Sequence, residues 1–311
     1  LCFLEVPKVF SLKGSVVTPA MMLELSRAVQ RVLIRPEVSG VVVTQPADNI
    51  EETAYFVSIS LSDVFQNQNS KPIVFTTCMN PEDPMFDGTK NLLDSIRVAC
   101  HDVKGDISTV VVCMNGEIHA ASRAQLTHTN KASALASPGW GPVGYVDRDN
   151  VYFRCGALEL DTGLNFPMLK KLTAKVPVVK AMCGDDGALL EMFLEKEPDA
   201  IIVEGFGRGN LPAGMMPAIK KAVKKGIFVV ISTRASSGRV LDSTVFPGSV
   251  AQCLECGCLL AGETTTSKAR LLLMYVLSQK EAIQLKKEDP ERFFAYVQEC
   301  LDPVLTNRLF G

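Results

Sequence analysis

The chain has 311 residues, of which 47% are hydrophobic and 21% charged, and this composition excludes collagen-like and low-complexity proteins. The formal net charge of −2 argues against the basic surface of a nucleic-acid-binding protein and against a polybasic membrane patch. No apolar run approaches the roughly 18 residues that a membrane-spanning helix needs. The ten cysteines are scattered, which predicts reduced thiols in an intracellular protein of the cytoplasm or mitochondrion. Because the sequence opens at Leu1 without a methionine, we expect a trimmed chain.

Short apolar runs alternate with amphipathic stretches along the chain. Continuous apolar runs of four to six residues are typical of parallel strands covered on both faces. We predict such strands at 41–44, 73–77, 109–113, 200–203 and 228–232. Helices are predicted from Thr18-Pro19 onward, over 51–61, 213–225 and 266–279, and from Asp289-Pro290 onward. The alternation predicts an α/β fold with right-handed crossovers.

A polar, turn-rich cluster at 147–150 marks the expected division of the chain. We predict a larger, mostly parallel N-terminal domain over 1–150, a linker over 151–177, a smaller C-terminal α/β domain over 178–280 and a helical tail over 281–311. The apolar side of the tail helix, which includes Phe293, Val297 and Leu301, favours packing on its own domain. Docking to a partner is the alternative.

Two motifs invite a functional interpretation and a structural one. The Gly205–Asn210 stretch resembles a phosphate-binding glycine loop, but Leu211-Pro212 follows where a helix should start, so a tight turn is favoured. Cys253, Cys256 and Cys258 could offer three thiolates to zinc or an iron–sulfur cluster. Because no fourth ligand lies nearby and the flanks are apolar, we favour buried strand cysteines without a metal. No cofactor is predicted.

Asp48 is the most informative single residue, because it follows the predicted strand at 41–44. Carboxylates at the carboxyl end of a parallel strand lie where open α/β sheets bind ligands. The alternative is that Asp48 caps the following helix. The three histidines, His101, His119 and His128, are too scattered to suggest a catalytic triad.

Five ordered blocks resemble the bacterial-type L-asparaginases, in particular their cytosolic type I branch. The stretch Gly40–Ala54, which reads G-V-V-V-T-Q-P-A-D-N-I-E-E-T-A, resembles the second signature of that family. The other blocks are Met79-Asn80-Pro81 with Asp87-Gly88 and Asn91-Leu92, Arg123–His128 with Ala136-Ser137-Pro138, Gly207–Pro212, and Thr264–Ser278. Together they span about residues 8–280. The resemblance implies the two-domain fold of the family with its first strand missing.

The resemblance also implies a catalytic set. In the family, a threonine hydroxyl attacks a side-chain amide, and a second threonine, an aspartate and a lysine relay protons. Ala47 stands at the second threonine and Leu126 at the lysine, while Asp48 is retained. Gln45 and Pro46 replace a histidine and a glycine, and no T-G-G-T-I-like string supplies the first threonine. The loop near Lys13-Gly14-Ser15 lacks the expected substrate-binding pattern, and His128 matches a family histidine rather than a substitute base.

These losses lead us to predict a non-catalytic member of the family that serves as a structural or scaffold subunit. Its expected partners are other protein subunits or copies of itself, because enzymes of the family assemble as dimers and tetramers. Neither direct nucleic-acid contact nor a membrane span is expected. Two alternatives stay open: an amino-acid-binding regulatory protein that uses Asp48 without turnover, and an active L-asparaginase or related amidohydrolase that lacks its N-terminal segment.

Overall fold

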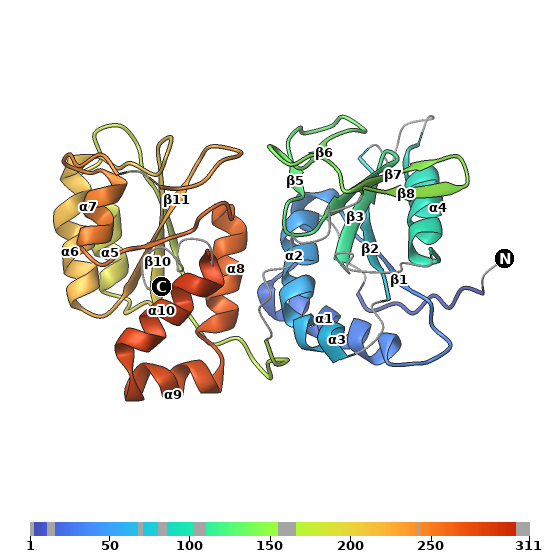
Figure 1. The fold of residues 1–311 in the computed structure, drawn as a ribbon, viewed down its shortest axis with the longest axis horizontal. Helices are drawn as coiled ribbons and strands as arrows, with labels where there is room; N and C mark the ends of the chain where they lie inside the picture. Colours follow the sequence, from blue (N-terminus) through green and yellow to red (C-terminus); the bar gives the residue numbers. More distant parts are fainter. Residues whose placement is uncertain are drawn as a thin grey trace. The chain divides into compact units, whose positions relative to one another are not determined.

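A computed structural model describes residues 3–10, 16–67, 71–79, 86–101, 110–154, 166–241 and 243–302. The chain divides into two compact units, Leu1–Met168 and Leu169–Gly311. Each unit is an α/β layer structure around its own sheet (Figure 1). The prediction of a two-domain α/β protein is therefore confirmed, while the exact boundaries of the linker and the tail stay a prediction.

The sheet of the first unit is mixed, not mostly parallel as predicted. Its first three strands, β1 (Val41–Thr44), β2 (Ile73–Thr76) and β3 (Val110–Met114), are parallel neighbours. The next three, β4 (Glu117–Ala120), β7 (Gly144–Asp147) and β8 (Asn150–Phe153), are added antiparallel in the order β3-β4-β7-β8. A separate short pair is formed by β5 (Gln125–Leu126) and β6 (Leu135–Ala136).

The antiparallel extension begins at the Asn115-Gly116 turn between β3 and β4. Both residues have positive φ, at 53° and 78°. Two such residues in a row are typical of a type I′ turn, whose twist matches that of a hairpin. This turn sends the chain back beside β3 instead of into a crossover helix, and the sheet therefore changes from parallel to antiparallel at this point.

Helices cover both faces of the first sheet. The helices α1 (Pro19–Leu33), α2 (Ile50–Ser60) and α3 (Ser62–Asn67) lie on one side, and α4 (Gly88–Ala99) lies on the other (Figure 1). The α1 helix begins as predicted, because Oγ1 of Thr18 accepts a hydrogen bond from the Met21 amide at 3.3 Å and Pro19 occupies the first turn. The buried core beneath α2 includes Ile50 and Phe75.

The second unit holds a fully parallel sheet in the order β12-β11-β10-β9. Its strands are β9 (Val178–Lys180), β10 (Ala200–Gly205), β11 (Phe228–Thr233) and β12 (Leu259–Leu260). The helices α5 (Ala188–Leu194), α6 (Met216–Lys224), which follows the short 3-10 turn η2 (Ala213–Met215), and α7 (Val250–Glu255) pack on one face. The helices α8 (Thr266–Val276) and α10 (Pro290–Leu301) lie on the other (Figure 1).

The C-terminal helices belong to the second unit. The α9 helix (Lys280–Glu288) leads into α10, whose start is capped by Asp289, since Oδ1 accepts from the Arg292 amide at 3.0 Å. Phe293 and Val297 are buried on the inner side of α10, which packs on α8 and β12. Within the described residues, this apolar side is covered by the chain's own second unit, as the sequence predicts.

Candidate functional site

The retained carboxylate of the signature lies where β1 ends. After Thr44 the chain runs through Gln45 and Pro46 into a 3-10 turn, η1 (Ala47–Asn49), and then directly into α2. Parallel strands present their carboxyl ends at the same edge of a sheet, and this edge is where open α/β folds bind ligands. Ala47 and Asp48 therefore occupy the position that the sequence predicts.

Asp48 does not serve as the helix cap that the alternative interpretation requires. The N-cap position of α2 is Asn49, and no side-chain cap bond is made there. Asp48 lies inside the 3-10 turn with an exposed side chain. Among the described residues, its carboxylate has no hydrogen-bond or ion-pair partner, so it is available to a ligand.

Hydrogen bonds of the Gln45 and Thr53 side chains stabilise the η1 turn. Nε2 of Gln45 donates to Oγ1 of Thr53 at 3.2 Å and to Oδ1 of Asn49 at 3.4 Å. The hydroxyl of Thr53, which is fully buried, donates to the Asn49 carbonyl at 3.0 Å. The Gln45 amide donates to the carbonyl of Thr76 at 3.2 Å and so ties the turn to β2. These hydrogen bonds fix the backbone on both sides of Asp48.

Leu126 is brought to the same place by Glu51. The carboxylate of Glu51, in the first turn of α2, accepts a hydrogen bond from the Leu126 amide in β5. Glu51 lies three residues after Asp48, one helical turn away. The structure therefore ties the backbone of Leu126 to the first turn of α2, which directly follows Ala47 and Asp48. The roles of Glu51 and Thr53 do not follow from the sequence alone, although both residues belong to the E-E-T-A part of the signature.

A second polar network supports the carboxyl end of β2. Asp87 accepts hydrogen bonds from Sγ of Cys78 at 3.0 Å and from the Met79 amide at 3.2 Å. Nδ2 of Asn91 donates to the Thr77 carbonyl at 3.0 Å and to Asp87 at 3.1 Å, and its Oδ1 accepts from the Asn115 amide at 2.9 Å. The Asp87 and Asn91 block of the signature thus positions the loops that follow β2 and β3.

Several predicted positions do not join this site. Lys13-Gly14-Ser15 lies outside the described residues, and so does Asn80-Pro81. His101 is exposed, while His119 is buried in β4 with Nδ1 2.9 Å from Oγ of Ser137. Burial lowers the pKa of His119, and the neighbouring Glu117 opposes this effect. Nδ1 of His128 accepts backbone hydrogen bonds at 3.2 and 3.3 Å, so this residue stabilises its own loop.

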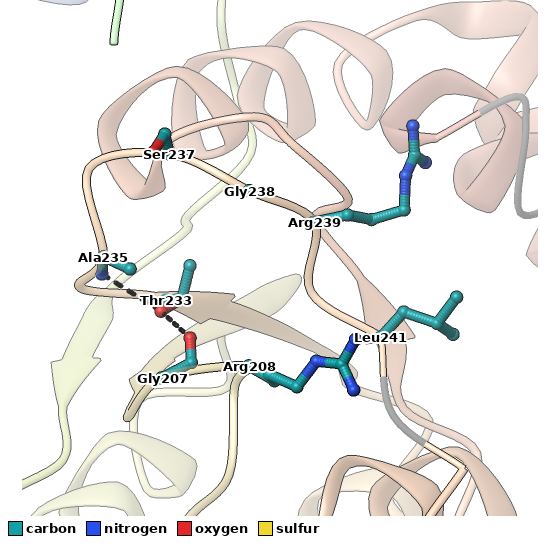
Figure 2. A pocket seen from close by; sticks show the side chains of 8 residues that line it. All are labelled: Gly207, Arg208, Thr233, Ala235, Ser237, Gly238, Arg239 and Leu241. Carbon is teal, nitrogen blue, oxygen red and sulfur yellow. Dashed lines mark hydrogen bonds between the residues drawn. The ribbon is translucent and has the colours of Figure 1, made fainter. Parts of the chain in front are cut away.

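The glycine loop of the second unit is a tight turn, as favoured from the sequence. Phe206 and Asn210 exchange backbone hydrogen bonds of 2.8 and 3.0 Å. Beside the turn lies a pocket of about 430 Å³ at the carboxyl ends of β10 and β11, which Figure 2 shows. Its lining includes Gly207, Arg208, Thr233 and Ser237. Arg239 is another lining residue. In Figure 2 its guanidinium is directed away from the other lining side chains, and it forms an ion pair with Asp302.

The three clustered cysteines do not form a metal centre. Within the described residues, no group of three or more histidine, cysteine, aspartate or glutamate side chains is arranged to hold a metal ion. The expectation of strand cysteines was wrong, because Cys253 lies in α7, Cys256 ends that helix and Cys258 lies outside the strands. Only Cys258 directly precedes a strand, β12. In the described part of the chain, no helix is both long and apolar enough to cross a membrane.

Comparisons with known proteins place both units in one family. The family described as "Asparaginase, N-terminal" matches residues 1–157, and "Glutaminase/Asparaginase C-terminal domain" matches residues 175–288. An L-asparaginase of Bacillus licheniformis is 30% identical over 91% of this chain and 85% of its own length. A probable L-asparaginase of Deinococcus radiodurans is 30% identical over 92% and 83%.

Other relatives extend the comparison. A glutamyl-tRNA(Gln) amidotransferase subunit from Haloquadratum walsbyi is 28% identical over 84% of this chain and 58% of its own length. The crystal structure of a probable cytoplasmic L-asparaginase from Campylobacter jejuni superposes with a TM-score of 0.78 at 26% identity, covering 92% of this chain and 85% of that one. The names of these relatives do not mention the mitochondrion, so they give the predicted mitochondrial location no support.

These findings contradict the prediction of a non-catalytic scaffold protein. Relatives that share 28–30% identity over most of the chain are named as L-asparaginases, and the superposed structure carries the same name. The prediction that the protein is not an enzyme gains no support from them, since the named relatives are amidohydrolases and a component of an amidotransferase. With both of its units matched, the chain belongs to the asparaginase family.

Proposed function

We propose that this protein is an amidohydrolase that releases ammonia from the side-chain amide of a small amino acid, with asparagine as the first candidate substrate. The observation that carries the proposal is the family match across both units, together with the exposed Asp48 at the carboxyl end of β1. The names of the relatives, L-asparaginase and glutaminase-asparaginase, support the same substrate class.

Amide hydrolysis needs an attacking oxygen, a base that takes its proton and a proton for the departing nitrogen. Neither the methyl group of Ala47 nor the side chain of Leu126 can serve any of these roles. We assign the base to Asp48. Its carboxylate takes a proton from a water molecule whose oxygen attacks the amide carbon. The carbon–nitrogen bond then breaks, and the nitrogen leaves with that proton as ammonia, so that amide and water become carboxylic acid and ammonia.

The expected rates follow from this assignment. A positioned general base contributes roughly 10²–10⁴-fold to such a reaction. Loss of the Asp48 carboxylate should therefore lower kcat/KM by about that factor, without unfolding the protein. The exposed position of Asp48 makes Asp48→Asn a conservative change, because the amide fills the same space.

The test is ammonia release from asparagine and glutamine by the full chain. We expect wild-type activity above the buffer blank and a loss of about 100-fold or more in Asp48→Asn. Glu24→Gln is the matched control, since Glu24 is an equally exposed carboxylate on α1, away from the signature. No ammonia from the wild type with either amide, or equal rates for the wild type and Asp48→Asn, would overturn the proposal.

A second candidate, amino-acid binding without turnover, is favoured by Ala47 and Leu126. These two side chains cannot ionise, so among the family's relay positions named above Asp48 is the ionisable residue that we expect to contact a ligand. Its carboxylate suits the ammonium group of an amino acid. Here asparagine or aspartate should raise the melting temperature in a saturable manner without ammonia release. The shift should be absent in Asp48→Asn and present in Glu24→Gln. An unchanged melting temperature at millimolar ligand would exclude this candidate.

The partners also stay a prediction. The relatives named as amidotransferase subunits belong, by that name, to a larger enzyme, and they support a search for protein partners or a second copy of this chain. The native mass of the purified protein is the direct measurement.

A further inference from the structure

Two of the clustered cysteines of the second unit occupy a specific backbone motif at the end of α7. The amide of Cys258 donates to the carbonyl of Cys253 at 3.0 Å, and the amide of Gly257 donates to the carbonyl of Leu254 at 2.8 Å. Gly257 has a φ of +88°. These two nested hydrogen bonds around a left-handed glycine define a Schellman motif, in which the chain turns back over the last helical turn.

A Schellman motif brings two side chains together, those of the residues that its outer hydrogen bond joins. These are frequently apolar residues in contact, but here they are Cys253 and Cys258. Both are buried, at 0% and 2% exposure, in the same core cluster. Their thiols are hydrogen-bonded to each other. The motif thus holds two sulfur atoms side by side in an apolar core.

Their hydrogen bonding distinguishes the two sulfurs. The hydrogen bond from Cys258 lowers the pKa of Cys253, against the opposing effect of burial. The same hydrogen bond and burial both raise the pKa of Cys258 well above its ordinary value. Sγ of Cys253 also lies 3.9 Å from Sδ of Met216.

Cys256 lies between them in sequence but not in the motif. It occupies the C-cap position, is only partly buried, and burial raises its pKa. Sequence spacing alone would favour a Cys253–Cys256 pair, since C-x-x-C is a familiar redox motif. The backbone hydrogen bonds favour Cys258 instead.

We propose that Cys253 and Cys258 are a site of reversible oxidation, at which a small peroxide such as hydrogen peroxide produces a disulfide within the Schellman turn. The thiolate of one cysteine of the pair attacks one peroxide oxygen, the oxygen–oxygen bond breaks, and the second oxygen leaves as water after taking a proton. That cysteine is then a sulfenic acid. The sulfur of the other cysteine attacks it, the sulfur–sulfur bond forms, and a second water leaves with the proton of that thiol.

The buried position restricts the oxidant. Hydrogen peroxide is far smaller than a disulfide reagent, so we expect the reaction in the folded protein with peroxide rather than with such a reagent. The cross-link would join the end of α7 to the start of β12. The first amide of α7, that of Val250, donates to Oδ1 of Asn210 at 3.1 Å, so the same helix supports the glycine loop beside the pocket. This proposal does not depend on the proposed amidohydrolase activity.

The test is peptide mass spectrometry on the reduced, full-length protein after peroxide treatment and alkylation under denaturing conditions. The peptide that contains all three cysteines should lose two hydrogens and carry a single alkyl group, on Cys256. Dithiothreitol should restore three alkylation sites. The exposed Cys100 and Cys183 report in the same digest that peroxide has acted.

Two variants provide the controls. Cys256→Ser should form the disulfide to the same extent as the wild type, while Cys258→Ala should form none and leave Cys253 alkylated or oxidised further. A disulfide that includes Cys256 would overturn the proposal. So would full alkylation of all three cysteines in wild-type protein whose Cys183 is oxidised. Because this second result comes from the wild type, misfolding of a variant cannot obscure it.

Discussion

The side chain of Gln298 in α10 completes the edge of the second sheet, and its removal should lower the free energy of unfolding. Its Oε1 accepts from the Leu260 amide at 2.9 Å, and its Nε2 donates to the Leu260 carbonyl at 3.0 Å. The amide of the next residue, Ala261, points the other way, to Ile231 of β11 at 2.9 Å. The side chain of Gln298 therefore takes the place of a neighbouring strand along β12, and its exposure is only 1%.

The magnitude follows from the two backbone groups that lose their partner. A buried polar group left without a hydrogen bond costs about 1–3 kcal/mol, so Gln298→Ala should lower the free energy of unfolding by about 2–6 kcal/mol. Gln298→Met should cost about as much, although it keeps most of the volume. Gln284→Ala is the control, because Gln284 is exposed and bonds only to Glu288 among the described residues; it should cost less than about 0.5 kcal/mol.

Urea unfolding followed by fluorescence and by amide hydrogen exchange measures this effect. Because Gln298 and Leu260 both lie in the second unit, the loss should appear in the unfolding of that unit, and exchange of the Leu260 amide should accelerate. If Gln298→Met lost no more stability than Gln284→Ala and the Leu260 amide stayed protected, the idea that a side chain completes this sheet edge would be wrong.

Three further predictions concern single side chains. Burial lowers the pKa of His119 below its ordinary 6.5, so the unfolded chain binds a proton that the folded chain does not. Stability should thus fall below pH 6.5 by up to about 1.4 kcal/mol per pH unit, and urea titrations of His119→Gln should lack this part of the slope. Lys71 donates to the carbonyls of Leu33 and Arg35 at 2.9 and 2.6 Å, so Lys71→Met should lower the melting temperature, at a cost of about 1–3 kcal/mol; an unchanged value would refute the role. Asn210→Ala should cost about 1 kcal/mol and accelerate exchange of the first amide of α7, and unaltered protection would contradict it.

Much of the fold could be predicted because its signals are local. The strand at 41–44 is a continuous apolar run, and Thr18-Pro19 starts a helix by capping chemistry that needs no tertiary contact. The antiparallel half of the first sheet was missed, although Asn115-Gly116 is the dipeptide that favours a type I′ hairpin turn. This dipeptide favours a hairpin over a crossover helix at this point of the sequence.

The site was predictable only in part, for a physical reason. The placement of Asp48 follows from the end of one strand, but the placement of Leu126 beside the same turn depends on Glu51, which reaches from α2 to β5 across 75 residues of sequence. The pairing of Cys253 with Cys258 depends likewise on the left-handed conformation of Gly257. The prediction of a scaffold protein rested on the substituted positions 45–47 and 126 and on the absence of a T-G-G-T-I-like string, whereas relatives that are similar over most of the chain are named as enzymes.

The most direct test of the central claim is the release of ammonia from asparagine, followed to completion with the full-length protein and with Asp48→Asn. The proposed function predicts stoichiometric conversion of asparagine to aspartate and ammonia by the wild type, and a rate at least about 100-fold lower for the variant. Absence of ammonia above the blank from a folded wild-type protein, with glutamine as well as asparagine, would contradict it.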